Sequence, residues 1–160
     1  MKQRSRLFSN WILTAFAVIG LFAFTACEHD LGETDSMMYT INGNANGSQV
    51  SPTVTGTGTG TITGTYDQNT NQLTYTITWT GLSGQATAGY LFTGTPGPRA
   101  TTAHALSTGT LTSTASGYSG KIILTREEEI ELLNGRLFYA ISTGTNARGE
   151  IAGKITAVRK

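Results

Sequence analysis

The sequence predicts an all-β domain, an antiparallel β-sandwich with one short helix. Threonine, a β-branched residue that favours strands, occurs 29 times in 160 residues, and 20 glycines can supply turns and bulges. Residues 72–80 alternate apolar and polar side chains with a period of two, which indicates a strand buried on one face. Turn sequences separate seven or eight such segments, a spacing typical of a sandwich or barrel.

Residues 54–66 and 72–80 carry the clearest strand patterns. In the first segment threonine alternates with glycine or an apolar residue, so the threonines should share one face and the glycines should leave the other open to a close neighbour. The turn-forming residues 67–71 between the segments predict an antiparallel hairpin. The side chains expected in the core from the second segment are Leu73, Tyr75, Ile77 and Trp79.

One helix is expected directly after the sixth strand segment. Thr125 as N-cap and Glu128 three residues later form a capping-box pattern, and Gly135 is a natural end after about two turns. The acidic run 127–129 suits the positive end of the helix dipole, so it is interpreted as a solvated helix surface rather than a metal site. The remaining expected strands are residues 37–42, 88–93, 104–112, 119–124, 136–143 and 150–158.

Residues 1–26 have the organisation of a secretory signal. Three basic residues lie within the first six positions, an apolar run follows over residues 11–24, and small residues precede Cys27. The stretch ending at Cys27 resembles a bacterial lipobox, with Phe24 where such motifs usually carry Leu. This resemblance implies that residues 1–26 are removed and Cys27 is lipidated. A plain signal peptide and an uncleaved signal anchor are the alternatives, although about 14 apolar residues fall short of the ~20 of a membrane span.

The predicted domain organisation follows from this leader. Residues 27–36 are acidic and lack apolar periodicity, which predicts a flexible tether, and residues 37–160 form the folded domain. Lipidation of Cys27 predicts a protein anchored in the cell envelope, with the outer membrane of a Gram-negative bacterium as the expected location. Periplasmic and surface-facing positions both stay open.

Charge and cysteine content exclude several classes of partner and site. Without residues 1–26 the chain has 8 basic and 10 acidic side chains, a net charge of 8 − 10 = −2, and shows no basic footprint for nucleic acid. A single cysteine excludes an internal disulfide or a cysteine-rich zinc site. The expected partners are therefore the membrane, through Cys27, and an unidentified protein or glycan.

Three stretches resemble motifs of the CHRD domain, a domain named after chordin and also found in bacterial secreted proteins. Residues 71–84 resemble its G-x-L-x-Y…G-L pattern, residues 124–139 its L-T…L-x-x-G-x-x-Y pattern, and residues 149–155 its G-E-I-R-G-x-I pattern. The likeness spans about residues 40–158. It implies a sandwich, immunoglobulin-like or similar to copper-zinc superoxide dismutase, and no established enzyme activity.

The departures from the family pattern concern histidines. The family usually carries A-H-I-H-G and V-H-T, whereas Tyr90 and Phe92 stand in the first stretch and Ser142 in the second. If those histidines bind metal in relatives, this chain has lost all three. Tyr90 and Phe92 share a strand face beside a Gly/Pro loop, so they are candidates for an aromatic platform that binds a glycan or peptide; the alternative places them in the core.

No catalytic, cofactor or metal site is expected. The two histidines, His29 and His104, are too few for a transition-metal site, and His104 is interpreted as a partly exposed strand residue. Glu150 is expected to pair with Arg148 or Arg136, or to cap a turn. Asp67, Asn69 and Asn71 resemble the start of a calcium-binding loop. The Gly and the later Glu of such a loop are missing, so a turn is the favoured interpretation.

The preferred functional hypothesis is a lipid-anchored envelope module with a binding or scaffolding role and no enzymatic activity. One alternative is a degenerate superoxide-dismutase-like domain that binds metal or retains an enzymatic activity. Another is a domain of a larger envelope assembly that offers a sheet edge for strand addition.

Overall fold

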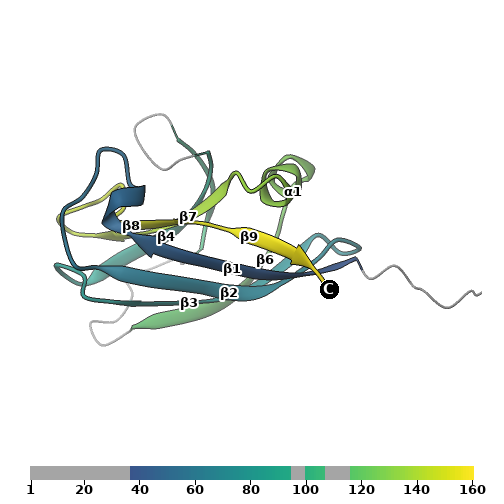
Figure 1. Ribbon diagram of the computed structural model, residues 1–160, viewed down its shortest axis with the longest axis horizontal. Helices are drawn as coiled ribbons and strands as arrows, with labels where there is room; N and C mark the ends of the chain where they lie inside the picture. Colours follow the sequence, from purple (N-terminus) through teal and green to yellow (C-terminus); the bar gives the residue numbers. More distant parts are fainter. Residues whose placement is uncertain (1–36, 95–99, 107–115) are drawn as a thin grey trace, which may run out of the picture. The chain divides into compact units, whose positions relative to one another are not determined.

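The computed structural model describes residues 37–94, 100–106 and 116–160, and Figure 1 shows the strands and helices formed by these residues. The predicted leader and tether, residues 1–36, lie outside them. The strands are β1 (Met38–Asn46), β2 (Thr59–Asp67), β3 (Gln72–Thr80), β4 (Ala86–Thr93), β5 (Thr101–Ala105), β6 (Gly117–Ile123), β7 (Leu137–Thr143), β8 (Ile151–Lys154) and β9 (Thr156–Arg159). The helices are the 3-10 helix η2 (Gly47–Gln49) and the α-helix α1 (Arg126–Leu133).

All strand pairs are antiparallel, in the order β5-β4-β7-β8-β1-β2-β3-β6, with β9 paired to β1 beside β8. The sheet curls, so that strands distant in this order face each other. The Tyr75 hydroxyl of β3 donates to the Leu106 carbonyl just after β5, at 2.8 Å, and the Tyr118 hydroxyl of β6 lies against Gly89 of β4. The prediction of an all-β, sandwich-like fold with one short helix is confirmed.

One hydrophobic cluster fills the space between the two layers. Both layers contribute, for example Ile62 and Ile77 from one and Leu91, Tyr139 and Ile141 from the other, all 0% exposed. The alternation of residues 72–80 is confirmed, because all four predicted core side chains of β3 are buried. Burial of these large apolar groups is the main favourable contribution to folding.

The β2 segment confirms the alternation but corrects the start of the strand. Thr61 and Thr63 are exposed while Gly60 and Ile62 are buried. A Cβ atom at Gly60 would lie 2.9 Å from Ile151 Cδ1 and 3.0 Å from the Thr78 carbonyl oxygen, so any larger residue would force these neighbours to shift. The strand begins at Thr59 and not at residue 54, because the Val54 amide donates to the Gly47 carbonyl at 3.0 Å and ties this part of the chain to η2.

Other strand predictions are wrong in their extent. The predicted strand over residues 37–42 continues as β1 to Asn46, because Ala45 and Asn46 pair with both β2 and β8. The predicted strand over residues 150–158 is two strands, because the Ile155 amide donates to the Leu137 carbonyl at 2.8 Å and the Ile155 side chain enters the core. Strand β5 starts at Thr101, before the predicted start at His104, and pairs with β4; residues 107–112 of that prediction lie outside the described residues.

The capping box of α1 is confirmed, but the interpretation of residues 127–129 as a solvated surface is wrong for Glu128, which is 7% exposed because its carboxylate turns back to the cap. The Thr125 hydroxyl accepts from the Glu128 amide at 3.3 Å, and the Glu128 carboxylate accepts from the Thr125 amide at 2.7 Å. In the described part of the chain no helix is long and apolar enough to cross a membrane.

Replacing Ile77 by Ala tests the packing of the core. Ile77 is fully buried, so Ile77→Ala should lower the free energy of unfolding by about 2–5 kcal/mol. The exposed Thr63 on the neighbouring strand is the control, and Thr63→Ala should cost about 1 kcal/mol or less. Denaturant unfolding of both variants measures the difference; equal costs would contradict the described orientation of the strands.

Candidate functional site

The outer surface of β2 and β3 carries two ranks of threonines, which we call the threonine face. Each threonine of one strand lies directly opposite a threonine of the other. Six of the eight are exposed and Thr65 and Thr74 are half-buried. The opposed pairs are Thr59–Thr80, Thr61–Thr78, Thr63–Thr76 and Thr65–Thr74.

Asparagines extend this face across β1. Asn42, Asn44 and Asn46 alternate along the strand and lie opposite residues of β2. The charged groups beside the face both lie at its turn end: Asp67 ends β2, and Lys121 of β6 is opposite Thr74, the first threonine of β3. From there to Thr59 and Thr80 at the other end, the described threonines and asparagines present hydroxyl, methyl and amide groups.

Cross-strand hydrogen bonds order several hydroxyls on this surface. Thr61 Oγ1 and Thr78 Oγ1 are 2.8 Å apart, and Thr76 Oγ1 is 2.8 Å from Ser119 Oγ of β6. Because a hydroxyl has one donor and two acceptor positions, each of these groups keeps capacity for a ligand. The face therefore presents both donors and acceptors at fixed positions.

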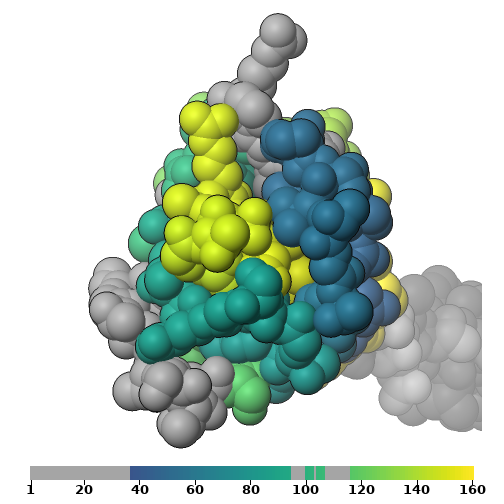
Figure 2. All heavy atoms as spheres, turned by 90° about the vertical axis from the view of Figure 1, so that its left-hand side faces the viewer, coloured from purple at the N-terminus to yellow at the C-terminus, as the bar shows by residue number. Residues whose placement is uncertain are grey.

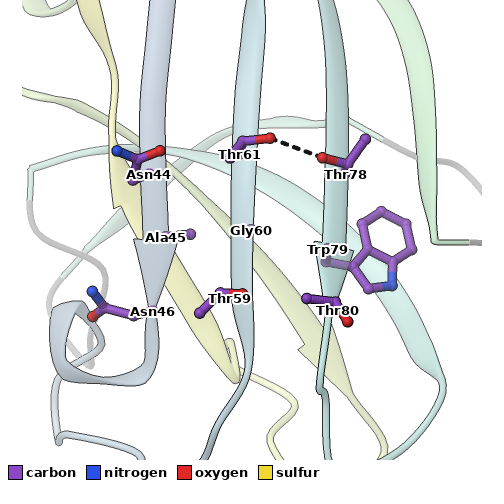
Figure 3. A pocket seen from close by; sticks show the side chains of 9 residues that line it. All are labelled: Asn44, Ala45, Asn46, Thr59, Gly60, Thr61, Thr78, Trp79 and Thr80. Atoms are coloured by element: carbon purple, nitrogen blue, oxygen red, sulfur yellow. Dashed lines mark hydrogen bonds between the residues drawn. The ribbon is translucent and has the colours of Figure 1, made fainter.

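An open hollow of about 440 Å³ lies at one end of the threonine face. Figure 3 shows Asn44, Thr61 and Thr78 in one row across β1, β2 and β3. A second row, two residues along each strand, consists of Asn46, Thr59 and Thr80. No charged side chain of the described residues lines the hollow. Its lining consists of Asn44, Ala45, Asn46, Thr59, Gly60, Thr61, Thr78, Trp79 and Thr80.

Glu150 joins two loops at the same end of the domain. Glu150 is 3% exposed. Its carboxylate accepts hydrogen bonds from the backbone amide and the hydroxyl of Ser83. It also accepts from the Thr143 hydroxyl at 2.7 Å and from the side-chain amide of Asn146 at 3.4 Å. Figure 2 views this end, where the segments after β1, β3 and β7 lie side by side in blue, teal and yellow. Glu150 thus ties the loop after β3 to the loop after β7.

The predicted pairing of Glu150 with Arg148 or Arg136 is wrong. Arg136 instead pairs with Glu131, at 2.7 Å. The alternative prediction, that Glu150 caps a turn, agrees with the hydrogen bonds from Ser83, Thr143 and Asn146 to its carboxylate. Burial alone would raise the pKa of Glu150, but the hydrogen bonds from Ser83, Thr143 and Asn146 outweigh burial and hold the pKa below its ordinary value.

Tyr90 and Phe92 do share a strand face, with ring centroids 6.1 Å apart. Phe92 is 8% exposed and Tyr90 is half-buried; both pack with Phe138 and Ala140 in a second, smaller hydrophobic cluster. A ligand-binding role for the pair stays a prediction. Ser142, at a family histidine position, is buried, and its hydroxyl has no hydrogen-bond partner in the described structure.

Asp67, Asn69, Asn71 and His104, the other residues considered as possible metal ligands, make local contacts. The Asn69 amide donates to Asp67 Oδ1 at 2.9 Å and Asn71 adopts a φ of 53°, which confirms the turn. His104 Nε2 lies 3.0 Å from the Glu128 carboxylate, and its side chain is 30% exposed, as expected. Among the described residues no group of three or more His, Cys, Asp or Glu gathers to hold a metal ion. Cys27 lies outside these residues.

The sequence predicts that the threonines of each segment share one face, but not that the two runs align into one array that could form a site. The signal was present as two T-x-T-x-T runs, but their alignment depends on register, and a slip of one residue would turn one run inward.

Fold and surface together define a β-sandwich module whose outer face is polar and largely uncharged. Residues 42–155 match the family model of the CHRD domain, and the chain belongs to this family. CHRD membership is consistent with a β-rich binding or scaffolding module. Neither a curated protein nor a solved structure matches the chain.

Replacing Glu150 by Gln tests whether its carboxylate stabilises the end of the domain where the loops after β3 and β7 meet. Because the folded-state pKa lies below the unfolded value of ~4.3, the carboxylate stabilises the wild-type fold at neutral pH, and this contribution is lost as the pH falls through the folded-state pKa. Glu150→Gln should lower the free energy of unfolding by about 1–3 kcal/mol at neutral pH.

Thermal unfolding between neutral and strongly acidic pH should show the difference between Glu150→Gln and the wild type shrinking on acidification. Glu127→Gln, at an exposed helix position, is the matched control and should differ less from the wild type at neutral pH. A difference that stays constant or grows at acidic pH would contradict this role.

Proposed function

We propose that this CHRD domain is a non-enzymatic binding module, held at the cell envelope by lipid on Cys27, which binds a neutral, hydrogen-bonding ligand on the threonine face. The observation that carries the proposal is the uncharged array of hydroxyls and amides across β1, β2 and β3, with a hollow of about 440 Å³ at its end.

The chemistry of the face favours a neutral ligand. Phosphate-bearing and carboxylate-bearing ligands are bound mainly through Arg and Lys, and the described face has neither between Lys121, at its turn end, and the hollow at its other end. Hydroxyls and amides both donate and accept hydrogen bonds, which suits a ligand made of the same kinds of groups. The hollow adds the concave shape that binding sites usually have.

The attachment at Cys27 rests on the leader and on the physics of lipid anchors. Two or more acyl chains hold a protein stably, because each buried CH₂ contributes ~0.8 kcal/mol. The acidic residues 28–36 would then separate the domain from the membrane surface. Such a tether leaves the threonine face free to meet a ligand outside the membrane.

Replacing Cys27 by Ser tests the anchor. The wild-type protein, expressed in a Gram-negative host fed with labelled palmitate, should take up label and sediment with membranes. Cys27→Ser should lose both properties, because Ser lacks the thiol that is acylated. Ser36→Ala, within the predicted tether, is the control and should behave as the wild type. An unlabelled wild-type protein, or membrane retention of Cys27→Ser, would refute the anchor.

Binding to a panel of insoluble matrices tests the ligand class. The full chain in detergent micelles should be retained by at least one neutral matrix among ice, β-glucan and chitin, and not by an anionic polysaccharide resin. Asn44→Lys and Thr78→Lys place charge in the hollow and should lower retention about tenfold, the loss expected for ~1.4 kcal/mol.

Thr87→Lys is the matched control for this panel, because Thr87 is exposed on β4, outside the threonine face. It should be retained as the wild type. Retention by the anionic resin alone, or retention that the face variants leave unchanged, would overturn the proposed binding face.

A further inference from the structure

We propose that the ligand of the threonine face is ordered water, the surface of ice; this inference rests on the proposed function and names its ligand. The face combines three properties seldom found together: a regular two-dimensional repeat, an absence of charge between its turn end and its other end, and a methyl group beside every hydroxyl of the two ranks.

The repeat of the face follows from strand geometry. Threonines two residues apart on one strand repeat every ~6.7 Å, and the two strands lie ~4.8 Å apart. The register of β2 and β3 is unbroken over all nine paired positions, from Thr59–Thr80 to Asp67–Gln72, so the four threonine pairs keep this spacing. On the prism faces of ice, rows of water oxygens repeat on a similar scale in both directions.

The side chains are also held in place. A β-branched side chain is restricted at χ1, so threonine loses little freedom on binding. The hydrogen bonds between Thr61 and Thr78 and between Thr76 and Ser119, both 2.8 Å, restrict the orientation of these hydroxyls. Each hydroxyl both donates and accepts, as a lattice water does. The methyl groups favour contact with ordered water over liquid water, because the ordering that apolar surface imposes is already present there.

A sugar ligand fits the same face less well. A glycan usually binds where an aromatic ring offers an apolar, flat surface beside polar groups. On β3 the aromatic side chains Tyr75 and Trp79 belong to the core and are 2% and 7% exposed, so Trp79 offers little ring surface to a sugar although it is among the residues that line the hollow. The described face itself consists of hydroxyls, methyls and amides, and lacks such a platform.

Sheet twist sets the size of the contact. Neighbouring strands rotate by about 20–25°, so a flat lattice meets the two threonine ranks best and departs from β1 and β6. A contact of eight threonines is small, and so we expect adsorption to ice and inhibition of its recrystallisation. On a protein anchored through Cys27, this face would attach the envelope to ice or limit the growth of crystals against it.

Partition into slowly growing ice tests the inference. The full chain, fluorescently labelled and held in detergent micelles, should be enriched in the ice fraction relative to labelled micelles alone. Thr63→Tyr and Thr78→Tyr put a bulky ring on the threonine face while keeping a strand-favouring residue, and should lower the enrichment about tenfold. Thr87→Tyr, on β4, is the matched control and should partition as the wild type. Thermal unfolding verifies that the variants fold.

Each outcome separates the ligand from the binding function. Enrichment lost only in the face variants supports ice as the ligand. A wild-type protein excluded from ice but retained on β-glucan or chitin through the threonine face overturns ice and keeps the proposed binding function; tyrosines on the face would then leave sugar binding intact or strengthen it. Enrichment in ice that Thr63→Tyr and Thr78→Tyr leave unchanged overturns the inference. A protein that binds no neutral matrix overturns both.

Discussion

The register of the β2–β3 hairpin is the constraint on which the rest of the structure depends. It places all eight threonines outside and the rings of Tyr75 and Trp79 inside. A slip of one residue on β3 would exchange the two faces, which would bury hydroxyls without partners and expose aromatic rings. The turn supports the register locally, because Asn71 adopts a left-handed conformation and accepts a bond from the Tyr66 hydroxyl at 3.2 Å.

At the end of the domain where the loops after β1, β3 and β7 meet, polar contacts hold the loops in place. The single cysteine leaves the chain without an internal disulfide, and the loops after β1, β3 and β7 meet at one end of the sandwich. Glu150 binds groups from two of these loops, and the Gly47 carbonyl binds the Val54 amide within the third. A buried carboxylate without a cationic partner is stabilised when enough donors surround it, and Ser83, Thr143 and Asn146 supply them.

Features set by local chemistry could be predicted from the sequence. Strand β3 and the Thr125–Glu128 cap depend on alternation and on contacts within four residues, and both were predicted at the right positions. Features set by tertiary contacts were missed. The break at Ile155 exists because its amide bonds to β7 while its side chain fills the core, and one partner of Glu150, Ser83, lies 67 residues away in the sequence. The candidate site belongs to the same class: each threonine run is visible alone, but the array exists only after pairing.

The two outer surfaces of the sandwich differ in a way that decides where a ligand can bind. Outside β4 and β7, Phe92 and Ala140 are covered by their own small cluster, which includes Val50 from the segment after β1. Part of that surface is therefore already used for packing. Outside β2 and β3, the side chains of Thr61 and Thr63 remain open to solvent. The glycine at position 60 makes this possible, because it lets the strand lie directly on Ile151 while its neighbours keep their hydroxyls outward. The same T-G alternation thus closes the core on one side and builds the threonine face on the other.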